Sequence, residues 1–159
     1  LRARVVAGSP ALRERFEALR RDLLRFAVRR DTLRDDVRSM RERMRAELSR
    51  SGPGEFDLKQ DPGGITDIEF LAQYWTLLWA ERYAELVTYS DNIRQLESLA
   101  SADLVPQATV DVLTGAYRTY RQRMHHLSLE AASNVVQVAE FADVRAAVTE
   151  IWNATMEGK

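Results

Sequence analysis

The sequence predicts an all-α fold, a helical bundle of about six helices, and three observations predict it. Apolar residues recur at three- and four-residue spacing along most of the 159 residues. No segment shows the convincing alternation of a half-buried strand, and only residues 132–138 read as a short extended piece. The composition, 45% apolar and 30% charged, is that of a globular chain. A single domain of this size buries roughly 70% of the surface that its unfolded chain exposes.

The first two helices are predicted from their boundaries and apolar stripes. Ser9 and Pro10 begin the first helix, since serine accepts from free backbone N–H groups and proline suits the first turn. The second helix follows Asp31 and ends before the break at Gly52, Pro53 and Gly54. Their stripes are Leu12, Phe16, Leu19, Leu23 and Phe26, and then Leu33, Val37, Met40, Met44 and Leu48.

The third predicted helix, "IEFLAQYWTLLWAERYAEL" at residues 68–86, is the most apolar of the chain. Its apolar side chains cover most of the circumference, which predicts burial on most sides and a central place in the bundle. They include Phe70, Leu71, Tyr74, Trp75, Leu78 and Trp79.

Three further helices complete the predicted bundle. Ser90 and Asp91 cap a short one, Pro106 opens a long one, and the last runs from about Phe141 to Met156. The tyrosine, tryptophan and methionine stripes are interpreted as core rather than as a base-stacking surface. The long helix carries Val110, Leu113, Tyr117, Tyr120, Met124 and Leu127, and the last carries Val144, Val148, Ile151 and, as a further candidate, Trp152.

The charge is unevenly spread, although the net charge is only -1. Residues 1–50 hold 15 arginines against 8 aspartates and glutamates, whereas residues 51–159 hold 8 basic and 16 acidic residues. One interpretation is a basic arm for nucleic acid or an acidic partner. The other is a solvated helix surface, which is favoured because acids alternate with the arginines at pairing distance. We therefore expect no nucleic-acid partner.

The composition also excludes several classes of protein. There is no cysteine, so there is no disulfide framework and no cysteine metal site, which fits a reducing, cytoplasmic compartment. No apolar run approaches the roughly 20 residues of a membrane span, and no signal peptide is visible. Because the chain starts at Leu1 without methionine, we expect it to be part of a longer protein.

The segment "FDLKQDPGGITDIEF", residues 56–70, is the candidate for chemistry, and it has two interpretations. The structural one is a helix start. Thr66 and Glu69 stand in the T-x-x-E pattern of a capping box just before the apolar helix. Asp67 and Glu69 also suit the positive end of a helix dipole.

The other interpretation is a phosphate-side site. Lys59 is the only internal lysine of a chain with 21 arginines, and its compact ammonium suits a phosphate. Two adjacent glycines permit close approach of the backbone to a ligand, and a helix N-terminus offers N–H groups to an anion. The segment is not a Walker loop, whose G-x-x-x-x-G-K-[ST] pattern is absent. The candidate residues are Lys59, Gly63, Gly64, Asp67 and Glu69.

Other constellations are weaker. His125 and His126 are adjacent and cannot point the same way from a helix, and the Glu-x-x-His pattern of di-iron bundles is missing. We therefore expect no metal site in this chain. Asn92 and Arg94 begin the short helix and are interpreted as capping and surface residues.

The sequence resembles the bacterial glutamine synthetase adenylyltransferases over about residues 1–158. The resemblance rests on the segment at 56–70 and on three later segments, "LAQYWTL", "YSDNIRQLESLA" and "AYRTYRQRMHHLSLE". In that family a Lys…Gly-Gly…Ile-Glu motif opens the core helix of both helical domains, and this form resembles the C-terminal, adenylylating half. The related PII uridylyltransferases carry a similar helical domain with a Gly-Gly-Leu-Arg-Asp-Ile-Glu version, from which Thr66 departs.

The resemblance implies a reaction and a division of labour. The family transfers AMP from ATP, with Mg²⁺, to a tyrosine of glutamine synthetase, and is regulated by glutamine and the PII signal protein. Its metal-binding catalytic aspartates belong to a nucleotidyltransferase domain, expected upstream of Leu1, so this chain alone is expected to be inactive. Residues 1–8 then form the tail of that domain or a connector, and residues 9–159 the helical domain. The alternative is a regulatory docking module for glutamine synthetase or PII, with no part in the active site.

Overall fold

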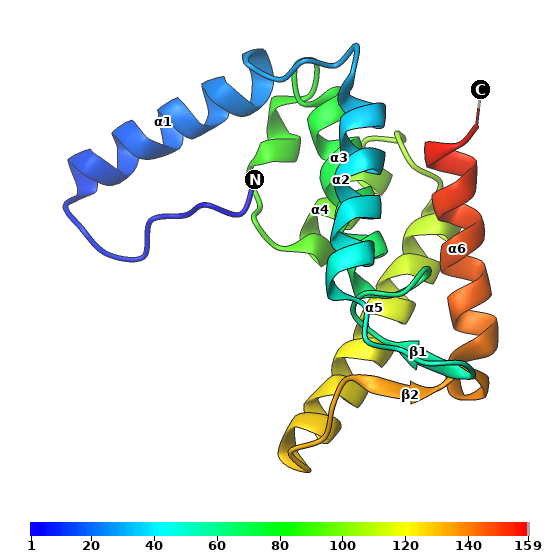
Figure 1. The fold of residues 1–159 in the computed structure, drawn as a ribbon. Helices are drawn as coiled ribbons and strands as arrows, with labels where there is room; N and C mark the ends of the chain where they lie inside the picture. Colours follow the sequence, from blue (N-terminus) through cyan, green and yellow to red (C-terminus); the bar gives the residue numbers. More distant parts are fainter. Residues whose placement is uncertain (159) are drawn as a thin grey trace.

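A computed structural model describes residues 1–158, and it confirms the all-α bundle (Figure 1). Two short 3₁₀ helices, η1 (Ala84–Val87) and η2 (Val138–Phe141), join the longer elements. No helix in this described part is both long and apolar enough to cross a membrane. The six α-helices of these residues are α1 (Pro10–Phe26), α2 (Leu33–Leu48), α3 (Ile65–Trp79), α4 (Asn92–Ser101), α5 (Gln107–Leu129) and α6 (Ala142–Met156).

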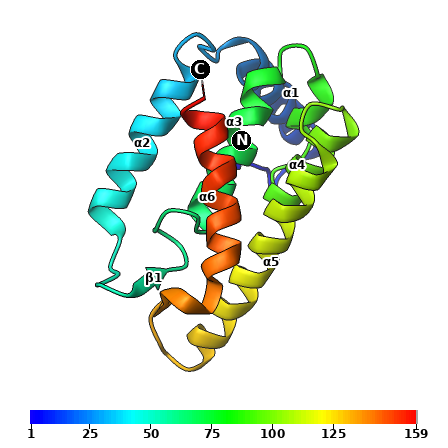
Figure 2. The ribbon, with the colours of Figure 1, turned by 90° about the vertical axis from the view of Figure 1, so that its right-hand side faces the viewer.

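Helix α3 is the centre of the bundle, as its apolar circumference predicts. It contacts α2, α4, α5 and α6, which surround it in the two views of Figures 1 and 2. Its fully buried residues include Ile68, Leu71 and Ala72. The α5 seam is buried as well, with Leu113 and Tyr120 inaccessible to solvent.

The predicted end of the third helix is wrong, because α3 ends at Trp79 rather than near residue 86. Arginine side chains donate hydrogen bonds to the backbone carbonyl groups at this end. Arg30 Nε donates to the Leu78 carbonyl at 3.2 Å, and Arg25 donates to the carbonyls of Ala80 and Glu81 at 3.3 and 3.2 Å. Cationic donors at a helix C-terminus satisfy carbonyls that another turn of helix would use.

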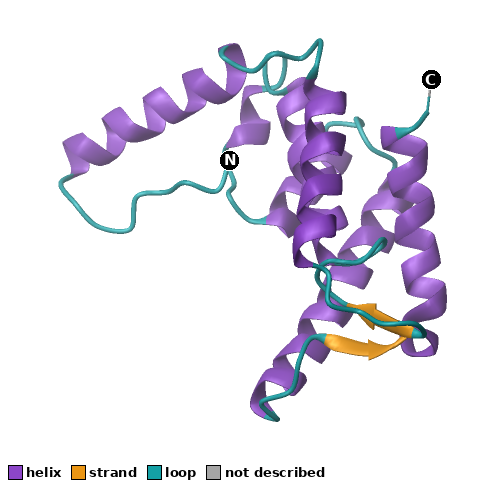
Figure 3. Ribbon diagram, in the orientation of Figure 1, coloured by secondary structure: helices purple, strands orange, loops and turns teal. Residues whose placement is uncertain are grey.

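A two-stranded antiparallel sheet closes the lower end of the bundle (Figure 3). Strand β2 (Val135–Gln137) confirms the predicted extended piece, whereas strand β1 (Glu55–Asp57) has no counterpart among the predicted elements. Phe56 pairs with Val136, and both side chains are buried. The strands are only three residues long, too short for apolar alternation to be recognised in the sequence.

Helix α1 extends away from the rest of the molecule (Figure 1) and contacts mainly η1. It begins as predicted, since the Ser9 hydroxyl accepts from the Leu12 N–H at 3.4 Å. Its apolar stripe, however, is not covered. The side chains of Leu12, Leu19, Leu23 and Phe26 are between 52% and 61% exposed.

Two arginines are buried, which corrects the interpretation of all the arginines as a solvated surface. Arg20 of α1 donates to the Val87 carbonyl at 2.7 Å and to the Leu1 carbonyl at 2.8 Å, so it fastens α1 and the chain start to η1. Arg41 of α2 is completely buried. On the same helix Met40 is half exposed, so the interpretation of the methionines as core is wrong there.

Candidate functional site

Aspartate carboxylates hold the turn that carries Lys59 by accepting hydrogen bonds. Asp57 Oδ1 accepts the backbone N–H groups of Lys59 and Gln60 at 2.9 and 3.1 Å. Asp61 Oδ2 accepts the N–H of Asp57 at 2.9 Å, and its Oδ1 accepts the Ser49 hydroxyl at 2.6 Å. These bonds fix the backbone between β1 and α3 from both sides, as aspartates commonly do in turns.

Asp61 is held in its charged form. Burial by itself opposes ionisation, but the Ser49 and Ser51 hydroxyls, the Asp57 N–H and the charge of Arg145 together lower the pKa of Asp61 below its ordinary value. The carboxylate therefore accepts hydrogen bonds throughout the neutral pH range.

Asp67 lies behind this turn in a buried ion pair with Arg41. Arg41 Nε is 2.5 Å from Asp67 Oδ1, and its Nη2 donates to the Gln60 carbonyl at 2.7 Å. Arg45 adds a longer contact to Asp67 at 3.6 Å. Burial lowers the pKa of Arg41, and the charge of Asp67 opposes that effect. The pair thus ties α2 to the start of α3.

The predicted capping box is wrong. Helix α3 begins at Ile65 with Gly64 as its N-cap, so Thr66 and Glu69 lie inside the helix, and the N-cap residue supplies no capping side chain. Instead Asp67 reaches back, and its Oδ2 accepts the N–H of Gly63 at 2.7 Å. The sequence pattern does not distinguish these two starts, because both place an acid in the first turn.

The N–H groups at the start of α3 are used internally. The N–H groups of Ile65 and Thr66 donate to the carbonyls of Leu58 and Lys59 at 2.9 and 3.2 Å. The N–H of Gly64 donates to the Asp61 carbonyl at 2.9 Å. The expectation that this helix start offers free N–H groups to an anion is therefore wrong.

The two glycines permit close packing. Gly63 has φ +80°, and a Cβ there would lie 2.5 Å from the Arg145 carbonyl oxygen of α6. A Cβ on Gly64 would lie 2.8 Å from the Leu58 carbonyl oxygen. The turn thus touches α6, and Arg145 strengthens this contact by donating to the Pro62 carbonyl at 3.0 Å.

Glu69 belongs to a different cluster, on the opposite side of α3 from Asp67. Its Oε1 accepts from Asn92 Nδ2 of α4 at 3.2 Å and from the Tyr117 hydroxyl of α5 at 3.4 Å. Arg2 of the chain start forms an ion pair with the same oxygen at 2.6 Å. Asn92 and Tyr117 lie in two of the segments that carry the family resemblance, but the pattern around them reads as a helix cap and an apolar seam. The interpretation of Asn92 as a surface residue is wrong, because its side chain is buried.

Lys59 is exposed, and its side chain takes part in none of the ion pairs found among residues 1–158. The predicted site residues therefore lie in three separate places. Gly63, Gly64 and Asp67 form the interior of the turn, Glu69 joins α4 and α5, and Lys59 faces solvent from the turn's outer side.

The histidines and acids of the described residues do not form a metal centre. His125 and His126 are both exposed on α5. Within residues 1–158 no group of three or more histidines, aspartates and glutamates has an arrangement that could hold a metal ion. These residues therefore do not fit Mg²⁺, and we derive no step through that ion in this chain.

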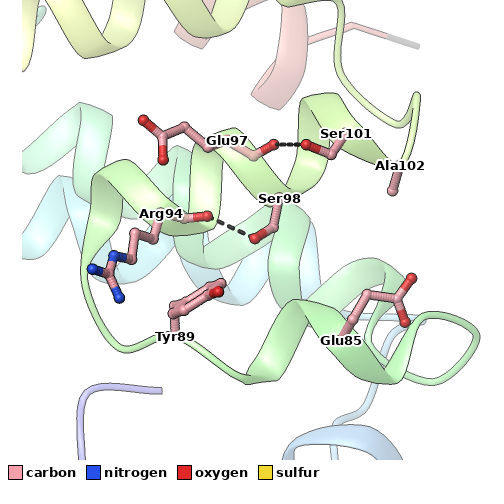
Figure 4. Close-up of a pocket in the computed structure, with 7 residues that line it drawn as sticks. All are labelled: Glu85, Tyr89, Arg94, Glu97, Ser98, Ser101 and Ala102. Atoms are coloured by element: carbon pink, nitrogen blue, oxygen red, sulfur yellow. Dashed lines mark hydrogen bonds between the residues drawn. The ribbon is translucent and has the colours of Figure 1, made fainter.

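An open hollow of about 380 Å³ lies over η1 and α4 (Figure 4). The Ser98 and Ser101 hydroxyls donate to the carbonyls of Arg94 and Glu97 one turn earlier, at 2.8 and 2.9 Å. The Arg94 guanidinium lies 5.1 Å from the centre of the Tyr89 ring. None of the predicted site residues contributes to this hollow, which is lined by Glu85, Tyr89, Arg94, Glu97, Ser98, Ser101 and Ala102.

The bundle, its central apolar helix and the braced turn before it define an all-α helical domain. Residues 33–153 match the protein-family model described as GlnD PII-uridylyltransferase, so the chain belongs to that family. The match begins at α2 and leaves out α1, which is also the helix that stands apart from the bundle.

Curated relatives confirm the resemblance to glutamine synthetase adenylyltransferases. The chain is 44% identical over 157 residues to a bifunctional glutamine synthetase adenylyltransferase/adenylyl-removing enzyme of Thioalkalivibrio sulfidiphilus. It is 43% identical, over the same length, to the protein of that description from Nitrosococcus oceani. Each comparison covers 99% of this chain but 16% of the relative, so the chain spans about a sixth of the length of these proteins.

Proposed function

We propose that this chain is the helical domain of an enzyme that transfers AMP from ATP to a tyrosine of glutamine synthetase. Family membership and the identity to two adenylyltransferases support the enzyme class. The form of the segment at 56–70 supports assignment to the adenylylating half. The partners in this proposal are glutamine synthetase, the PII signal protein and a preceding nucleotidyltransferase domain, all in the cytoplasm.

The observation that carries a direct role for this domain is the exposed Lys59 on a rigid turn. Asp57, Asp61 and the Asp67–Arg41 pair hold the turn from inside, while the lysine side chain has no partner among the ion pairs of residues 1–158. A cation presented from a fixed backbone suits transfer at a nucleotide phosphate, where catalysis is mostly positioning and electrostatic stabilisation.

In the proposed reaction the tyrosine hydroxyl oxygen bonds to the α-phosphorus of ATP, the bond from that phosphorus to pyrophosphate breaks, and the hydroxyl proton passes to solvent. ATP and Mg²⁺ are the nucleotide and the ion of the whole enzyme, and the aspartates that hold the ion are proposed to precede Leu1. Lys59 would then balance the negative charge of the phosphates, and the isolated chain would not catalyse.

The exposed stripe of α1 is the proposed joint with the nucleotidyltransferase domain. A helix with four large apolar side chains more than half exposed normally packs against something. Residues 1–8 would belong to the connection between the two domains. This proposal explains why α1 is held to the bundle by arginines while its apolar side stays open.

A regulatory docking module is the second candidate. The observation in its favour is that Gly63, Gly64 and Asp67 are used in internal packing, so that much of the motif is structural. In that case the isolated chain would retain glutamine synthetase or PII in a pull-down, and Lys59 would have no effect on AMP transfer.

The test is transfer of labelled AMP from Mg²⁺-ATP to active glutamine synthetase. We would compare this chain, a protein extended upstream through the preceding domain, and the extended protein with Lys59→Ala or Lys59→Arg. We expect transfer by the extended protein only, and a loss of roughly tenfold or more for Lys59→Ala, the scale of one lost transition-state contact.

Arg121→Ala, which removes an exposed charge from α5, is the matched control and should keep full activity. If Lys59→Ala is as active as Arg121→Ala, the phosphate role is excluded and the docking module is favoured. If the extended protein is inert, the adenylyltransferase assignment itself fails.

A further inference from the structure

The cluster around Glu69 contains a buried polar atom without a partner. Asn92 is only 5% exposed, and its Oδ1 makes no hydrogen bond within the described part of the chain. Its Nδ2 must face Glu69, because a carboxylate oxygen only accepts hydrogen bonds. The orientation of the amide is therefore determined, and the free atom is an acceptor. A buried acceptor without a partner is unfavourable, and a donor from a ligand would satisfy it.

The cluster already binds one guanidinium group. Arg2 lies 2.6 Å from Glu69 Oε1, and its side chain remains 54% exposed. The other members are far better fixed, since Glu69, Asn92 and Tyr117 come from α3, α4 and α5. Residues 1–8 form neither helix nor strand, and most of their side chains are exposed. The Arg2 side chain can thus exchange while the neighbouring Leu1 carbonyl stays bonded to Arg20 at 2.8 Å.

We propose that Glu69, Asn92 and Tyr117 form a binding site for a guanidinium group, with Arg2 as an exchangeable occupant. A guanidinium carries five N–H donors in one plane, so a ligand can address both the carboxylate and the free amide oxygen. The site discriminates by charge, because a mostly buried carboxylate left without its cation is unfavourable. This assignment does not depend on the proposed AMP transfer.

The chain itself provides the test. In the ¹⁵N-labelled Arg2→Ala chain, methylguanidinium should give saturable NMR shifts centred on the Asn92 side-chain amide. The unaltered chain should bind it at least about tenfold more weakly, because Arg2 occupies the site for most of the time. Methylurea, which has a similar shape but no charge, should give no saturable shift.

Three further variants make the test decisive. Arg4→Ala removes an equal charge from the same segment and should behave like the unaltered chain. Glu69→Gln added to Arg2→Ala should abolish binding, and Tyr117→Phe added instead should weaken it a few-fold if the glutamine variant does not fold. The proposal is overturned if the Arg2→Ala chain shows no saturable shift, or if it binds methylguanidinium no more tightly than the unaltered chain. It is also overturned if the added Glu69→Gln change leaves binding intact, or if methylurea gives the same shifts as methylguanidinium.

Discussion

Asp67 and Glu69 stand two residues apart and serve opposite sides of one helix. Asp67 is buried against Arg41 of α2, whereas Glu69 meets Asn92 and Tyr117 of α4 and α5. In an α-helix two positions are about 200° apart, so neighbouring acids in a motif need not share a role. Treating the motif as one site therefore combines residues that the fold separates.

We predict strong coupling between Arg41 and Asp67. Arg41→Met leaves Asp67 with only the longer contact to Arg45, and Asp67→Asn leaves the Arg41 charge buried without its partner. Each change alone should cost about 3 to 5 kcal/mol. The double variant should cost clearly less than the sum, since no unpaired charge remains. Urea unfolding of the four chains measures this coupling.

Arg38→Met is the matched control, because its pair with Glu42 is exposed on the same helix and should be worth about 0.5 kcal/mol. Additive losses for Arg41 and Asp67 would contradict a shared buried ion pair.

At the scale of elements, the turn before α3 and helix α6 fit together through a glycine. Gly63 has a positive φ, and a backbone carbonyl of α6 occupies the space that a Cβ would need. Arg145 completes the contact by donating to the Pro62 carbonyl and by lying over the Phe56 ring, 4.8 Å from its centre. The glycine of the motif is thus required by packing against Arg145, which lies 83 positions after Pro62 in the chain.

Gly63→Ala should destabilise the chain by roughly 2 kcal/mol or more, because it adds both backbone strain and an overlap with α6. Gly115→Ala is its matched control. No atom lies within 4 Å of a Cβ at Gly115, and alanine in mid-helix should raise stability by about 0.5 to 1 kcal/mol. Thermal unfolding of both variants gives the comparison, and equal effects would contradict the packing role.

Helices are predictable from the sequence because their signals are local. Capping residues and four-residue spacing locate α1, α2, α4, α5 and α6, and the structure confirms them. The end of α3 and the β1–β2 pair depend on contacts between distant segments, namely Arg25 and Arg30 at and beyond the end of α1, and a strand partner beyond α5. Such contacts leave no periodic pattern in the sequence.

The candidate site is predictable only in part for the same reason. Lys59 stands out because it is the one internal lysine, and the structure finds it exposed. Arg41 cannot be distinguished from its neighbours by sequence, since 15 arginines share the first 50 residues. Its burial is decided by Asp67 and Gln60, which the chain brings in from another element.

At the scale of the whole molecule, α1 is an appendage whose apolar stripe is left exposed. Because its stripe is exposed, Leu19→Ala should change the free energy of unfolding by no more than about 0.5 kcal/mol. Leu113→Ala, in the fully buried seam of α5, should cost about 2 to 5 kcal/mol. Urea unfolding of this chain compares the two, and a large loss for Leu19→Ala would show that α1 packs onto the bundle in solution.

The small sheet joins two segments that are far apart in the chain, since Asp57 pairs with Val135 and everything from α3 to α5 lies between them. Closing so long a loop is entropically expensive, whereas the helices form from local contacts. The strands are therefore expected to meet late, on the native side of the folding barrier. Their pairing would set how long the folded chain lasts before it opens, and hardly affect how fast it forms.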